Sequence, residues 1–250
     1  MNLKASKIIK LALISIILLF SSTSVQSAEE NKKLEEICKH LEEAFNQKDL
    51  DTLNNIFTND KMISPISKYT KFAERFPTSK WEVRPGKDLK DGRNSLQIFI
   101  IGNHTYGHHN YSLEAKQHLA VKINQGRIIS QEILGEQSIM QTNKDLLPIR
   151  LGIPDYVLTG SRYDIDIILE KPLGDSILAG GLISLSKEEV KKNISPPIEL
   201  EPMGGGGLFK TVKAPFNSGL QTWSAFIAHP KGLISVTKMV RVVSEESELY

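Results

Sequence analysis

Apolar residues in segment 30–46 recur at the spacing of one face of an α-helix, and lysine and glutamate fill most other positions. Asp49 is a suitable N-cap for a second, shorter helix. Residues 67–76 predict a third helix, which Pro77 ends. The apolar stripe of the first helix consists of Leu34, Ile37, Cys38, Leu41, Ala44 and Phe45. The pattern therefore predicts three consecutive helices.

From residue 81 onward, the period of the apolar positions changes from 3.6 to 2, which indicates strands. Asn124, Gln125 and Gly126 form a suitable hairpin turn between the last two of these strands. The expected strands lie at 81–84, 95–103, 111–123 and 127–140. Residues 29–140 are thus predicted to form three helices followed by an antiparallel meander.

Two segments of this region resemble the nuclear-transport-factor-2-like superfamily, which includes ketosteroid isomerase and SnoaL-type proteins. They are HLEEAFNQKDLDTLNNIFTNDK at 40–61 and YSLEAKQHLAVKINQGRIISQEIL at 111–134. In that superfamily, helices and a bent sheet form a cone around an apolar pocket. The resemblance implies an α+β cone at 29–140, with three helices on a curved antiparallel sheet and a ligand cavity inside. It also implies a homodimer as one candidate assembly.

The second half of the chain has shorter strands, with turn residues about every ten positions. About seven strands are expected between 148 and 243, which looks like an all-β sandwich of the immunoglobulin-like type. The chain has one cysteine, so a disulfide-pinned version is excluded. Residues 141–147 are a predicted polar linker, and residues 244–250 are a predicted acidic tail.

The start of the chain has the order of a secretory signal peptide over Met1–Ala28. Three lysines precede the apolar run Leu11–Phe20, and small polar residues follow it. The apolar run is shorter than the roughly 20 residues that span a bilayer. The sequence predicts an exported protein without a stable membrane anchor after cleavage. The expected compartment is the periplasm or the medium of a bacterium, with a thylakoid lumen as an alternative.

Net charge gives no reason to expect a nucleic-acid partner. The 250-residue chain has a formal net charge of +2, and loss of the three leader lysines changes this to −1. A nearly neutral mature chain lacks the basic surface that phosphate binding needs. Cys38 lies on the apolar stripe of the first helix, where we expect a buried, inert thiol.

Two glutamines are the main candidates for binding a ligand in the expected cone. Gln117 and Gln131 alternate with apolar neighbours, so they share the predicted inward face, and Tyr111 lies on the same face of its strand. Buried amides need hydrogen-bond partners, which a ligand could supply. Alternatively, they bond each other or the backbone, or a bulge reverses the faces. Glu132 and Glu136 have the opposite parity and are expected to point away, so no catalytic residue is predicted.

Two other segments attract attention but predict no metal or cofactor. His104, His108 and His109 lie near a hairpin turn, where no fixed backbone would bring ligands together. The glycines at 204–207 lack the Lys-Ser/Thr of a phosphate-binding loop and are not expected between a strand and a helix. We therefore expect an exposed turn and a flexible loop, respectively.

These observations favour an exported, non-catalytic binding or scaffold protein. Its cone pocket would bind a small apolar or amphipathic molecule, or its surface would bind a protein partner, with the sandwich as docking module. One alternative is an isomerase, dehydratase or hydrolase that uses the same pocket. Another is a purely structural protein whose cone is filled by its own side chains.

Overall fold

The computed structural model describes residues 32–57, 63–107, 109–142, 145, 147–171, 177–192 and 194–246. The predicted signal peptide, Met1–Ala28, lies outside these residues. No helix among the described residues has both the length and the apolar content that crossing a membrane requires.

The described chain up to Arg75 contains three helical segments, in the region where the 3.6-residue period predicts helices. A helical segment covers residues 32–47, followed by α2 (Leu50–Ile56) and α3 (Ile63–Arg75). Asp49 caps α2, because its carboxylate accepts a hydrogen bond from the Thr52 backbone N–H at 3.0 Å. A further short helix, α4 (Lys187–Lys192), lies in the second half.

Strands dominate the rest of the chain. The hairpin turn after β3 is confirmed, since Gln125 and Gly126 have φ values of 49° and 75°, as a tight hairpin turn requires. The described part of the second half contains eight strands, β5 to β12, where about seven were predicted. The strands are β1 (Lys80–Pro85), β2 (Asn94–Tyr106), β3 (His109–Asn124), β4 (Arg127–Thr142), β5 (Ile149–Gly152), β6 (Tyr156–Leu158), β7 (Arg162–Leu169), β8 (Leu178–Leu185), β9 (Glu201–Met203), β10 (Gly207–Lys213), β11 (Gly219–His229) and β12 (Gly232–Val243).

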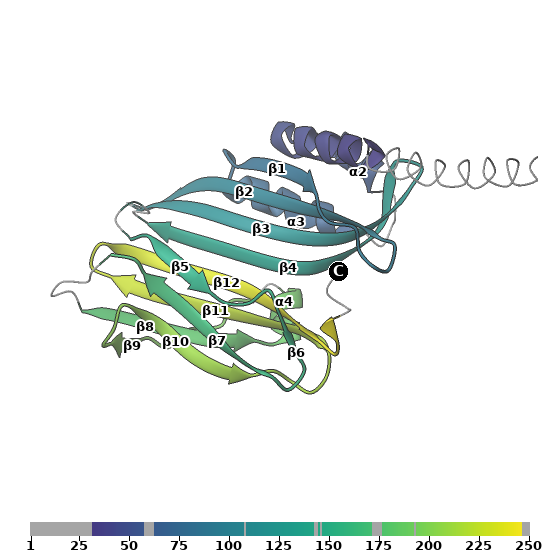
Figure 1. The fold of residues 1–250 in the computed structure, drawn as a ribbon. Helices are drawn as coiled ribbons and strands as arrows, with labels where there is room; N and C mark the ends of the chain where they lie inside the picture. Colours follow the sequence, from purple (N-terminus) through teal and green to yellow (C-terminus); the bar gives the residue numbers. More distant parts are fainter. Residues whose placement is uncertain are drawn as a thin grey trace, which may run out of the picture.

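Strands from both halves of the chain form one large sheet (Figure 1). Its order is β1-β2-β3-β4-β12-β11-β8-β9, and β6 also pairs with β12. The junction is the antiparallel pairing of β4 with β12, from Gln141 opposite Ile234 to Gln137 opposite Lys238. A second sheet has three strands in the order β10-β7-β5.

The predicted fold class, an α+β cone followed by a separate all-β sandwich, is therefore wrong. The meander β1–β4 does not close into a cone, because β4 uses its second edge to pair with β12. The second half has two β layers, but the strands of one layer, β8, β11 and β12, belong to the large sheet. The protein is mostly β, with helices on only part of one sheet face.

The N-terminal helices, up to α3, and the three-stranded sheet lie on opposite faces of the large sheet (Figure 1). On the helix-side face, Leu119 of β3 and Ile133 of β4 oppose each other and pack against the helices. On the sandwich-side face, Ile139 of β4 opposes Val236 of β12, and both pack against β5 and β7. Each layer thus buries a different half of the large sheet.

The outer edge of β1 is covered by polar side chains of the helix at 32–47. The Asn46 amide donates to the Trp81 carbonyl at 2.8 Å and accepts from the Trp81 N–H at 2.9 Å. The Glu42 carboxylate accepts from the Val83 N–H at 3.0 Å. Unpaired edge groups invite pairing with another chain, so these side chains close this end of the sheet.

We predict that Asn46→Ala destabilises the fold by about 1–2 kcal/mol, because it leaves the edge groups of Trp81 without their partners. Urea denaturation measures the change. Gln47→Ala is the matched control, since Gln47 is an exposed neighbour on the same helix. Equal stability of the two variants would contradict the capping role of Asn46.

Candidate functional site

The three residues predicted to line a pocket all lie on the helix-side face, but far from one another. Tyr111 and Gln117 both belong to β3, six residues apart, which is about 20 Å along a strand. Gln131 of β4 lies opposite Val121, a further four residues along β3. The structure therefore does not bring these three side chains together around one small ligand.

Gln117 forms a hydrogen bond with Glu136, which was predicted to lie on the opposite face of the sheet. Its amide Nε2 donates to Glu136 Oε2 at 3.3 Å. The pairing register shifts between His118 and Leu119, so that Leu134 of β4 has no partner on β3 and a bulge forms. The bulge reverses the parity of β4, and Glu136 comes to lie opposite Gln117. The expectation that Glu136 faces away from the glutamines is therefore wrong.

Glu132 does lie on the other face, opposite Ala120. Its carboxylate pairs with the Arg93 guanidinium at 2.6 Å, and Arg93 also contacts Asp91 at 2.6 Å. These ion pairs hold the segment before β2 against β4. They explain the position of Glu132 without a ligand.

Apolar side chains of the helices and the sheet pack together between these two layers. Leu53, Leu96, Val121 and Ile128 are fully buried there. The ring of Phe45 stacks on that of Trp81 with centroids 4.6 Å apart. The other members of this core are Leu34, Ile37, Cys38, Leu41, Ala44, Ile56, Tyr69, Ala73, Val83, Ile98 and Leu119. The region where a pocket was expected is thus a packed hydrophobic core.

Two polar groups lie inside this core without forming a reactive site. The Tyr69 hydroxyl donates to the Phe45 carbonyl at 2.6 Å, which satisfies it. Burial raises the pKa of the Cys38 thiol to about 12, and the nearby Glu35 charge adds to the effect. Cys38 is therefore a protonated thiol at neutral pH, as an inert core cysteine should be.

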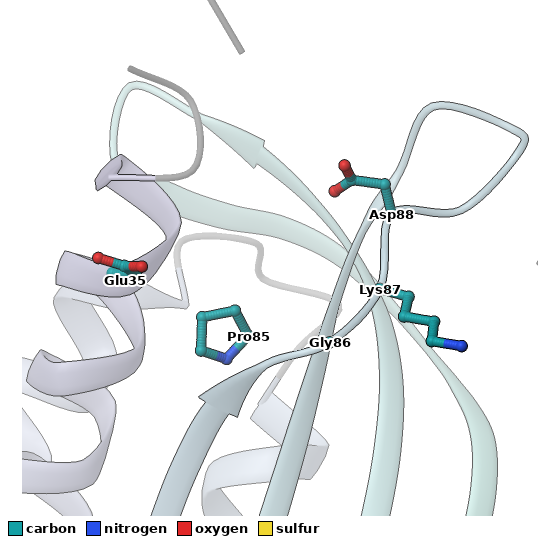
Figure 2. Close-up of a pocket in the computed structure, with 5 residues that line it drawn as sticks. All are labelled: Glu35, Pro85, Gly86, Lys87 and Asp88. Atoms are coloured by element: carbon teal, nitrogen blue, oxygen red, sulfur yellow. The ribbon is translucent and has the colours of Figure 1, made fainter. Parts of the chain in front are cut away.

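Figure 2 shows a surface depression between the helix at 32–47 and the segment after β1. Its volume is about 290 Å³, and it is lined by Glu35, Pro85, Gly86, Lys87 and Asp88. In this view the Lys87 side chain points away from Glu35. The lining groups do not converge on a common point, so the depression lacks the geometry of a specific site.

The histidine-rich hairpin forms packing contacts. The His104 ring lies 5.6 Å from that of Phe76, and the His109 ring lies 6.2 Å from that of Tyr111. His108 lies outside the described residues. Across the part of the chain that the structure describes, no three histidine, cysteine or acidic residues are grouped to hold a metal ion.

Ionisable residues gather instead where β4 and β12 diverge. The pairing of these strands ends at Lys238, and β6 pairs with β12 beyond it, from Arg241 onward. The Lys238 ammonium is buried, its side chain only 6% exposed, and it forms an ion pair with Asp155, which precedes β6. The Asp155 carbonyl also accepts from the Arg241 N–H at 2.9 Å. This ion pair ties the loop before β6 to the large sheet.

His118 lies on the same sandwich-side face, opposite Gly135 of β4. Its Nε2 is buried and has no hydrogen-bond partner among the described residues. Burial lowers the pKa of the imidazole, and the charges of Lys116 and Arg241 lower it further, while Asp155 opposes the shift. His118 is therefore neutral at pH 7 and is costly to protonate in the folded state.

Part of the chain matches a known protein family. Residues 144–243 match the model of a family described only as a domain of unknown function, DUF8623. The matched segment contains β5 to β12 and includes the edge of β12 to which β4 adds. No curated protein matches the chain.

We predict that acid destabilises the fold partly through His118. Its folded-state pKa is lowered, so below the unfolded pKa of about 6.5 the unfolded chain binds a proton that the folded chain resists. Stability should fall between pH 7.5 and pH 5.5, and His118→Gln should reduce that loss in thermal melts. His40→Gln, at an exposed helix position, is the control. An unchanged pH dependence in His118→Gln would contradict the prediction.

Proposed function

We propose that this chain is an exported, non-catalytic binding or scaffold protein that contacts a protein partner through its surface. The half that contains residues 144–243 would act as the docking module. The observation that carries the proposal is the packed core beneath the helices, where Leu96, Val121 and Ile128 are fully buried. A partner would be recognised through the outer faces and edges of the sheets.

The polar groups of the helix-side face support the same proposal. Gln117 donates a hydrogen bond to Glu136, so each group has a partner within the protein. Tyr111 and Gln131 are separated from Gln117 along the sheet. A general acid or base needs to reach a reacting atom within hydrogen-bond distance, and the three side chains are too far apart along the sheet to act on one small substrate together.

Native mass spectrometry of the chain, purified from the exported fraction of its host, tests this function. We expect a complex with a second polypeptide and no retained small molecule. Gln117→Leu is the control variant, because it removes the amide from the predicted pocket while leaving the outer edges unchanged. A stoichiometric small molecule that is lost in Gln117→Leu would overturn the proposal in favour of a pocket. Sequencing of the N-terminus tests export, since cleavage leaves a chain that begins near Ala28 or Glu29.

A further inference from the structure

Apart from the side strand β6, the strand orders of the two sheets end at β1, β9, β5 and β10, and three of these four ends are blunted. The edge of β1 is covered by Asn46 and Glu42. The edge strand β9 has three residues and contains Pro202. The edge strand β5 has four residues and lies between Pro148 and Pro154. Short strands, prolines and covering side chains are common ways to prevent pairing at an edge.

The fourth edge strand, β10, has seven residues and pairs only with β7. Leu169 N–H donates to the Gly206 carbonyl and Ala214 N–H to the Ser161 carbonyl, so the even-numbered residues of this segment bond toward β7. In an antiparallel pair, the intervening residues point their backbone groups the other way. Those of Phe209 and Thr211 therefore face outward, and they have no backbone partner among the described residues.

The side chains of β10 and the residues just after it include an exposed aromatic ring and two lysines. Phe209 is 62% exposed, on the outer side of the three-stranded sheet. Lys210 points to the inner side, where its ammonium lies 5.5 Å from the Trp223 ring centroid. The Lys213 ammonium lies 4.7 Å from the Phe216 ring. Neither lysine forms an ion pair with a residue that the structure describes. The edge thus offers hydrogen bonds, an apolar ring and two lysines without an ion-pair partner among the described residues.

We propose that the outer edge of β10 binds an extended, acidic segment of a protein partner by strand addition. The segment would bond the free backbone groups of Phe209 and Thr211. It would place a carboxylate opposite Lys210 and an apolar side chain beside Phe209. This inference rests on the proposed binding function and names its surface.

A second copy of the chain fits this edge less well. If two β10 strands paired antiparallel over most of their length, the two Lys210 side chains would lie on one face. They would be directly opposite or diagonal to each other, within about 8 Å. Like charges at that spacing on one face of a sheet are destabilising. An acidic segment removes this repulsion and gives Lys210 an ionic partner.

Selection from a phage-displayed library of random peptides tests the inference, with the full mature chain as target. Thr211→Pro removes the outward N–H and leaves the bonds to β7 in place. Thr211→Val is the matched control, because it keeps the N–H but, like proline, loses the side-chain bond to Asp164. We expect selected peptides in which acidic and apolar residues alternate. Thr211→Pro should weaken their binding about tenfold, and Thr211→Val should leave it unchanged.

Lys210→Glu provides a second test that leaves the backbone intact. It should weaken the acidic peptides and, in a new selection, favour basic ones. Failure to select any peptide above background, or binding that survives both Thr211→Pro and Lys210→Glu, would overturn the inference. A wild-type dimer that Thr211→Pro dissociates would assign the edge to a second copy instead. If the native complex survives Thr211→Pro, the binding function stands and only the β10 edge is excluded.

Discussion

The pairing of β4 with β12 is the contact on which the rest of the structure depends. It joins the meander of the first half to the β strands of the second half through a continuous ladder of backbone hydrogen bonds. Since side chains alternate across a strand, each strand at this junction contributes to two different faces. Met140 and Ile139 are adjacent on β4, yet they point to the helix side and the sandwich side, respectively. The helices and the small sheet can therefore each bury one face without competing for the same residues.

Two bulges in β4 change which of its side chains point toward the helices. Between Ile128 and Glu136 the register with β3 shifts twice, and each shift reverses which side chains point toward the helices. Ile128 and Ile133 thereby reach the same core although their separation is odd. The second shift brings Glu136 opposite Gln117. The bulges thus complete the core and also give the Gln117 amide, which was predicted to bind a ligand, a partner within the protein.

The strand edges of the two sheets are covered in different ways. At β1, an amide and a carboxylate from a helix replace the missing strand. Where β4 leaves β12, the short strand β6 and the ion pair of Asp155 with Lys238 take over. A buried ammonium without that carboxylate would be strongly destabilising. In the three-stranded sheet, the outward backbone groups of β10 have no backbone partner among the described residues.

The sequence by itself determined the helices, the long strands and the turn at Gln125, because these depend on local periodicity and on the φ angles of a few residues. It also indicated that Cys38 belongs to a core. Only the tertiary structure decided which strands are neighbours, on which face Glu136 lies and that Lys238 pairs with Asp155, 83 residues away. Backbone ladders form between any two strands of suitable shape, so a β edge does not specify its partner in the sequence. A single bulge then exchanges the faces of all residues beyond it. For these reasons, a correct reading of the individual elements still predicted the wrong fold class.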